Sequence, residues 1–168
     1  MARTNTKIGD VFFVKIDNNN KKYFQLVAFD STQLNSDVIR AFKKVYSLDE
    51  NPELSVIIND EVSFYTHCVT KFGLKMGLWE VVGNISEIGD FSQVVFRDTN
   101  DYGTRPGIDP IKISSNWHVW KINDNNFTLV GKLEGENRNS FIGLVMNPVG
   151  IVEMLKGNKY LTNYPDFE

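Results

Sequence analysis

Apolar and polar residues alternate along much of the chain, in the pattern of half-buried strands. The clearest case is 62–70, where Val62, Phe64, Thr66 and Cys68 share one face and polar or half-polar residues occupy the other. A period of two over such a run predicts a β-strand. Comparable short runs predict strands at 10–16, 23–29, 37–47, 56–58, 78–82, 92–97, 117–122, 127–133 and 141–146.

The segment 37–47 admits two interpretations. Val38, Phe42 and Val45 fall at roughly helical spacing, which would place them on one face of a helix. The same segment is rich in β-branched and aromatic residues, which favour a strand. We predict a strand here.

Two runs of Asn and Asp separate strands that are close in sequence. They occupy 17–20 and 123–126, and both side chains tolerate left-handed backbone and bond to nearby amides. Hairpins are therefore predicted at 10–29 and 117–133. The stretch 98–109 holds two Gly, one Pro and three Asp, which predicts a long loop of the kind that often carries function.

One helix is predicted near the C-terminus. Asn147 suits the N-cap, Pro148 suits the first helical position, and Gly157 ends the helix. The expected fold class is mostly β, or α+β by strict count. It would be an antiparallel, strongly bent sheet or a partly open barrel with one short C-terminal helix, in a single domain over 1–168.

Composition limits the partners of the chain. It has 168 residues with 42% hydrophobic residues, enough for one self-supporting core. The net charge is −3, and Lys21-Lys22 and Lys43-Lys44 are the only basic doublets. A dedicated nucleic-acid binder needs a basic surface, so we expect no nucleic-acid partner.

A single cysteine, Cys68, allows no internal disulfide, which fits a reducing compartment. No run approaches the roughly 18 apolar residues of a membrane span. The segment 1–7 is polar and lacks the apolar core of a signal peptide. We expect a cytoplasmic protein without a membrane partner. The two histidines lack the spacing of a metal site, and no cofactor is expected.

Candidate catalytic groups are few. Cys68 follows His67 directly, but neighbours in a strand point to opposite faces and cannot bond to each other. A nucleophilic thiol would need a base from elsewhere in the fold, so we predict a buried structural thiol. The adjacent carboxylates of 49–50 and 60–61 are the other acid/base candidates, and we expect solvent to surround them.

The segment 49–61 contains five carboxylates and no Lys or Arg, which makes it either a solvated edge or an acidic docking patch. These candidate contact residues are Asp49, Glu50, Glu53, Asp60 and Glu61. Trp117 and Trp120 lie three residues apart, so in a strand they point to opposite faces. One of them could then be exposed, and Trp120 is the candidate aromatic anchor for a partner.

Two runs carry a resemblance to a known family. The run 8–14 reads Ile-Gly-Asp-Val-Phe-Phe-Val, and 73–84 is an apolar strand signal with one central Trp between glycines. With Tyr23 and Gln25 in the second strand, this chain resembles the immunity protein 26 family of bacterial polymorphic-toxin systems. The resemblance implies scaffold roles for Gly9, Asp10, Trp79 and Gly83.

The resemblance also implies function: a protein that binds and neutralises a cognate toxin and performs no catalysis. Two alternatives stay open from the residues. One is a small hydrolase that uses Cys68 or a carboxylate pair. The other is an SH3-like barrel that binds nucleic acid, which would need a basic groove.

Overall fold

The computed structural model describes residues 5–168, so residues 1–4 of the polar N-terminal segment lie outside it. The described residues form eleven strands: β1 Asp10–Lys15, β2 Asn20–Asp30, β3 Ser36–Phe42, β4 Tyr46–Ser47, β5 Val62–Cys68, β6 Glu80–Asn84, β7 Val95–Thr99, β8 Trp117–Lys121, β9 Thr128–Gly131, β10 Phe141–Ile142 and β11 Val145–Met146. The α-helices are α1 Leu54–Ile57, α2 Thr70–Lys75 and α3 Pro148–Leu155, and η1 Gly135–Asn139 is a 3-10 helix.

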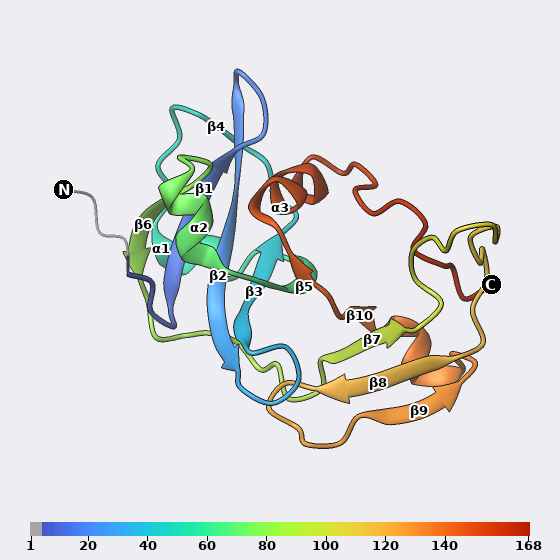
Figure 1. Cartoon of the computed structure of the whole chain (residues 1–168). Helices are drawn as coiled ribbons and strands as arrows, with labels where there is room; N and C mark the ends of the chain where they lie inside the picture. Colours follow the sequence, from blue (N-terminus) through green and yellow to red (C-terminus); the bar gives the residue numbers. More distant parts are fainter. Residues whose placement is uncertain (1–4) are drawn as a thin grey trace.

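The strands form two sheets (Figure 1). The larger has the order β11-β5-β3-β2-β1-β6, with β4 added beside β2, and the smaller has the order β10-β7-β8-β9. The predicted mostly β fold and the short C-terminal helix are confirmed, and neither sheet closes into a barrel. Most strand pairs are antiparallel as expected, but β11 with β5 and β10 with β7 are parallel.

Both parallel pairs involve the segment 141–146, where the prediction of one strand is wrong because the segment is divided between the sheets. Phe141–Ile142 pairs with β7 in the small sheet, and Val145–Met146 pairs with β5 in the large one. The two residues between them carry the chain across. This segment therefore joins the sheets covalently at the place where they also pack together.

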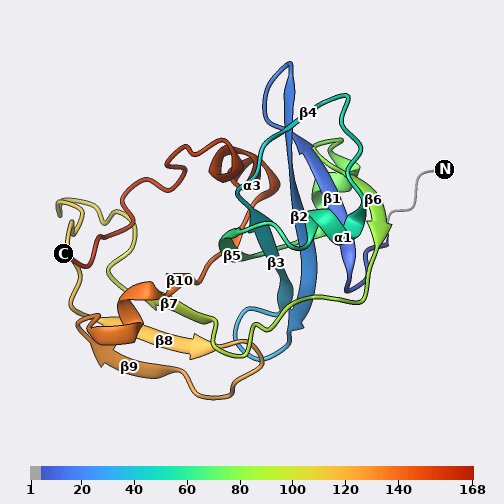
Figure 2. The same ribbon diagram turned by 180° about the vertical axis from the view of Figure 1, so that it is seen from behind.

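Apolar side chains from both sheets make their junction. Val27 and Val38 of the large sheet share a buried cluster with Phe96 and Trp120 of the small sheet. Seen from behind in Figure 2, the small sheet lies beside one end of the large one. Burial of this cluster is the main stabilising contribution to the junction.

A buried polar pair lies beside the same junction. His67 Nε2 is 2.9 Å from Asp30 Oδ2, and neither side chain is exposed. The other oxygen, Asp30 Oδ1, accepts from the backbone N–H groups of Thr32 and Asn123, and Asn123 follows β8 of the small sheet. The His67 ring also packs on Phe96 at 4.3 Å between centroids. The pair thus connects the two sheets.

The environment of this pair shifts both pKa values downward. Burial lowers the pKa of His67, although the Asp30 carboxylate opposes that shift. Burial raises the pKa of Asp30, but hydrogen bonds from His67 and Thr32 outweigh it and leave the pKa lowered. The geometry is therefore that of a neutral imidazole whose Nε2–H donates to an ionised carboxylate.

The Trp signature differs from its expected form. The predicted strand 78–82 begins only at Glu80. Gly73 lies in α2, and Gly77 follows the end of that helix. Trp79 is buried; its Nε1 donates to the Thr70 carbonyl at 2.9 Å, and its ring meets Phe24 edge-on at 5.1 Å. A Cβ on Gly73 would lie 2.0 Å from this ring, so the glycine admits the indole.

The predicted strand 56–58 is wrong, because the chain forms α1 there. Ile57 is buried in a cluster with Val11 and Tyr23, so this short helix covers one face of the first strands. Leu54 lies against Gly83, where a Cβ would approach Leu54 Cδ1 to 2.7 Å. Tertiary packing of this kind overrides the local strand preference.

Gly9 and Asp10, at the start of β1, are held by hydrogen bonds of the Gly9 backbone and the Asp10 carboxylate. Gly9 has φ +93°, in the region that favours glycine, and its N–H donates to the Leu26 carbonyl. Asp10 Oδ2 accepts from the Lys7 N–H at 2.8 Å, and Asp10 Oδ1 accepts from Asn84 Nδ2 at 2.9 Å. These contacts fix the start of β1 against β2 and β6.

The C-terminal segment after α3 crosses back towards the small sheet in both views (Figures 1 and 2). It lies beside the loop that follows β7, where the Gly103 N–H donates to the Asn163 carbonyl. Within residues 5–168, no helix combines the length and the apolar content needed to cross a membrane.

Candidate binding surface

The acidic segment 49–61 leaves β4, forms α1 and returns to β5. Asp49, Glu50, Glu53 and Glu61 are exposed, and Asp60 is half-buried. The structure therefore brings four of the five predicted carboxylates to the surface on one continuous segment. That segment rests on the first hairpin through Leu54 and Ile57.

A groove lined by both polar and apolar side chains lies along this segment. Its volume is about 350 Å³, and it lies between the start of the acidic segment, β2 and β6. The lining residues are Tyr23, Asn51, Pro52, Glu53, Leu54, Ile57 and Val82. Val82 is 44% exposed and nearby Val56 is 47% exposed. Carboxylates and accessible apolar side chains thus occur together, as in surfaces that bind other proteins.

Local hydrogen bonds hold the acidic residues in place. Glu50 Oε2 accepts from the Ser47 N–H at 2.6 Å, and Asp49 Oδ1 accepts from Ser47 Oγ at 3.1 Å. The Tyr46 hydroxyl donates to Asp60 Oδ2 at 2.6 Å. Burial raises the pKa of Tyr46, and Asp60 raises it further, so this hydroxyl remains a donor. The segment presents its charges on an ordered backbone.

Only part of this negative charge is neutralised within the molecule. Glu61 forms an ion pair with Lys43. In the described part of the chain, no cationic side chain lies within ion-pairing distance of Asp49, Glu50 or Glu53. Glu53 lines the groove, and Asp49 and Glu50 precede it on the same exposed segment.

Trp120 is not the exposed anchor that was expected. It is 3% exposed, and Trp117 is fully buried. The two rings do point to opposite faces, but each is covered on its own face of β8. Trp120 packs with Phe96 at the junction between the sheets, and Trp117 packs with Tyr164 of the C-terminal segment. Trp120 is therefore unavailable to a partner.

The surroundings of the Cys68 thiol do not activate it as a nucleophile. Cys68 is fully buried, and burial raises its pKa well above the ordinary value, with Asp37 adding to the shift. A protonated thiol shielded from solvent is unreactive. The predicted buried structural thiol is confirmed, and a hydrolase based on Cys68 gains no support. The neighbouring His67 is directed to Asp30 instead.

The predicted loop 98–109 starts within β7, which extends to Thr99. Beyond it, Asp101 Oδ2 accepts from Ser114 Oγ at 2.7 Å and from Asn116 Nδ2 at 3.2 Å. Thr99 Oγ1 lies 2.8 Å from Ser114 Oγ. These bonds tie the two ends of the loop together. Across residues 5–168, no group of three or more His, Cys, Asp or Glu side chains could hold a metal ion.

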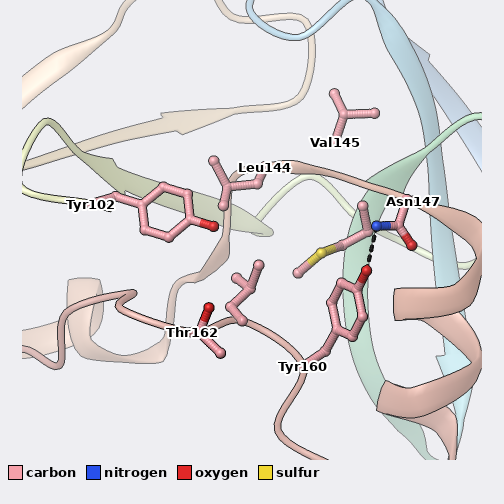
Figure 3. A pocket seen from close by; sticks show the side chains of 8 residues that line it. Tyr102, Leu144, Val145, Asn147, Tyr160 and Thr162 are labelled. Carbon is pink, nitrogen blue, oxygen red and sulfur yellow. Dashed lines mark hydrogen bonds between the residues drawn. The ribbon is translucent and has the colours of Figure 1, made fainter. Parts of the chain in front are cut away.

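A second concavity lies where β11, the loop after β7 and the C-terminal segment meet (Figure 3). Its volume is about 510 Å³, and its lining residues are Tyr102, Leu144, Val145, Met146, Asn147, Tyr160, Leu161 and Thr162. Asn147 Nδ2 donates to the Tyr160 hydroxyl, and the Tyr102 hydroxyl is directed towards the opening between them.

This cleft offers hydroxyl and amide groups, and its lining contains no carboxylate, imidazole, thiol, amine or guanidinium. The phenols of Tyr102 and Tyr160 are therefore its only ionisable side chains. No pattern in the sequence predicted the cleft, because Tyr102 and Tyr160 come from distant segments. The aromatic character of the C-terminal segment is the one local signal that could have drawn attention to it.

Comparison of the chain with protein-family models, with curated protein sequences and with solved structures finds no match.

Proposed function

We propose that this protein is an immunity protein that binds a cognate bacterial toxin domain in the cytoplasm and neutralises it without catalysis. The observation that carries the proposal is the acidic segment beside its groove. Asp49, Glu50 and Glu53 are exposed and uncompensated there, and apolar side chains are accessible next to them. The resemblance of 8–14 and 73–84 to an immunity family supports the same conclusion.

The carboxylates and the apolar side chains of this surface would contribute to binding in different ways. Exposed carboxylates accelerate the encounter with a basic partner and disfavour acidic ones. Apolar side chains in a groove supply the affinity once water is excluded. We therefore propose a toxin domain with a basic surface around at least one protruding apolar side chain. Nucleic acid, whose phosphates the carboxylates repel, is not expected to bind.

The experiment is a titration of the toxin domain encoded beside the gene with the purified protein. We expect a stoichiometric complex in size-exclusion chromatography and loss of toxin activity at the same ratio. Cys68→Ala should inhibit as well as the original protein, because a buried thiol has no part in the contact. Full toxin activity in the presence of excess protein, with no complex, would reject the proposal.

A further inference from the structure

We propose that a cavity against the C-terminal segment binds a small monocarboxylic acid with an apolar body, and that the Arg97 guanidinium receives its carboxylate. The cavity lies between β7, β10, the end of α3 and residues 158–166. It adjoins the cleft of Figure 3, with which it shares Met146, Tyr160 and Leu161. It shares no lining residue with the groove of the acidic segment, so the inference is independent of the proposed toxin binding.

The cavity has the size and the lining of a site for a small apolar molecule. Its volume is about 210 Å³, and roughly seven water molecules occupy that volume in the liquid. Its apolar lining residues include Ile142, Met146, Met154, Leu161 and Pro165. Small-molecule sites usually combine such apolar walls with a few polar groups that fix the orientation of the ligand.

Arg97 is a cation at the wall of this cavity. Its guanidinium interacts electrostatically with the Tyr164 phenol and the Asp166 carboxylate, and both of these residues also line the cavity. Asp166 is exposed, however, and within residues 5–168 no carboxylate lies within ion-pairing distance of Arg97. The half-buried guanidinium therefore keeps a positive charge that no direct ion pair neutralises.

Much of the hydrogen-bonding capacity of this guanidinium is also unused. Nη1 donates to the Ser140 carbonyl, whereas Nε is buried and has no acceptor within the described residues. The guanidinium lies 5.1 Å from the ring centroid of Phe167 and 5.8 Å from that of Trp117. These rings hold the cation in place but carry no full negative charge.

Burial of this cation has an energetic cost that an anion would offset. Burial lowers the pKa of Arg97, although Tyr164 and Asp166 oppose that shift. Arginine stays protonated in proteins, so the group remains charged in its half-buried position. Buried charges are normally paired, and a bound anion with access to the guanidinium would supply the missing partner.

The charge of the lining selects a monoanion. Arg97 and Lys159 are its cations and Asp166 is its one carboxylate, which leaves one net positive charge. A carboxylate matches the paired N–H donors of a guanidinium. A phosphate dianion would exceed this charge and would place further oxygens against apolar walls. A monocarboxylate with an apolar body satisfies both the cation and the walls.

An NMR titration of the full chain with sodium hexanoate tests the inference, because an arginine Nε–H gives its own signal in nitrogen–proton correlation spectra. Sodium chloride keeps the ionic strength constant. We expect the Arg97 Nε–H signal and the methyl signals of Met146 and Met154 to shift saturably with hexanoate. Hexanamide, which has the same size but no charge, should bind at least about tenfold more weakly.

Three variants assign the binding to this cavity. Arg97→Gln removes the charge and should weaken hexanoate binding at least about tenfold. The matched control Lys71→Gln removes a charge from an exposed position of α2 and should bind as the original chain does. Asp166→Asn removes the one carboxylate of the lining, so it should bind hexanoate about two- to fivefold more tightly.

Any of three results would overturn the inference: no saturable shift with hexanoate, equal binding of hexanamide, or full hexanoate affinity in Arg97→Gln. If Arg97→Gln does not fold, Asp166→Asn decides the question, because Asp166 is exposed and bonds to its neighbours through its backbone. Unchanged or weaker hexanoate binding in Asp166→Asn would then refute the placement of the ligand carboxylate at Arg97.

Discussion

Gly73 has no side chain, and this makes room for the Trp79 indole in the core. The indole lies over Gly73, donates to the Thr70 carbonyl and packs on Phe24. We expect Gly73→Ala to lower the free energy of unfolding by about 1–3 kcal/mol, because a Cβ 2.0 Å from the ring forces a rearrangement of a packed core. Urea denaturation followed by tryptophan fluorescence measures this change.

The control for this substitution is Lys75→Ala at the end of the same helix. Lys75 is exposed, so its replacement should change the free energy of unfolding by less than about 0.5 kcal/mol. Equal stability of Gly73→Ala and the original protein would show that Trp79 does not occupy the position described.

The buried pair of His67 and Asp30 makes stability depend on pH. The pKa of His67 is lowered in the folded state from its ordinary value of 6.5, so the unfolded chain takes up a proton more readily. The contribution of the neutral ring is fully present above pH 6.5 and decreases as the pH falls below that value. The lowered pKa of Asp30 adds a further loss at pH values below its ordinary 3.8.

We expect the free energy of unfolding to fall between pH 7 and pH 5, a window set by the ordinary pKa of 6.5. His67→Gln keeps an N–H donor for Asp30 but cannot titrate, so its unfolding free energy should depend less on pH across this range. Chemical denaturation at several pH values makes the comparison. An undiminished slope in His67→Gln would assign the effect to other groups.

For individual residues, the alternation of apolar and polar positions correctly predicted which strand faces the side chains occupy. It correctly gave a buried Cys68 and opposite directions for Trp117 and Trp120. It did not indicate that Trp120 would be buried, because exposure depends on what covers the second face of a sheet. Val27 and Val38 of the large sheet supply that cover, and nothing local to Trp120 encodes it.

Among the elements, α3 was predictable because its signals are local. Asn147 Oδ1 accepts from the Gly150 N–H at 2.8 Å, and Pro148 occupies the first helical position. Gly157 follows the helix with φ +85°. In contrast, α1 and α2 carry no side-chain N-cap and have four and six residues, so burial of Ile57 and accommodation of Trp79 decide their conformation.

The cap of α3 gives a test at this scale. We expect Asn147→Ala to lower the free energy of unfolding by about 1 kcal/mol, because the Gly150 N–H loses its acceptor. Asn147→Asp keeps the acceptor but not the amide that donates to Tyr160, so it should retain most of the stability. If both variants lost the same amount, the Tyr160 contact rather than the cap would be the important one.

For the whole molecule, the mostly β class followed from composition and periodicity, and the division into two sheets did not. The division depends on the segment 141–146, whose continuous apolar character predicts one strand. Its ends pair with β7 and β5, and these long-range partners are not encoded within the segment. The same limit applies to the groove beside the acidic segment, since Tyr23, Leu54 and Val82 meet only in the folded chain.

The central claim is that the acidic segment 49–61 and its groove bind a basic toxin domain. Its most direct test is the affinity of the neighbouring toxin domain for three proteins, measured by isothermal titration calorimetry. The first is the original chain, and the second carries Asp49→Lys, Glu50→Lys and Glu53→Lys. The third is a control with the same change in charge at exposed sites elsewhere, Asp109→Lys, Glu134→Lys and Glu136→Lys.

We expect the first triple variant to bind at least about 100-fold more weakly, the loss that roughly 3 kcal/mol across three contact charges would produce. The control should bind within about tenfold of the original chain, because it changes net charge without touching the surface. Equal weakening of both variants, or unchanged affinity in the first, would contradict the assignment of toxin binding to this segment.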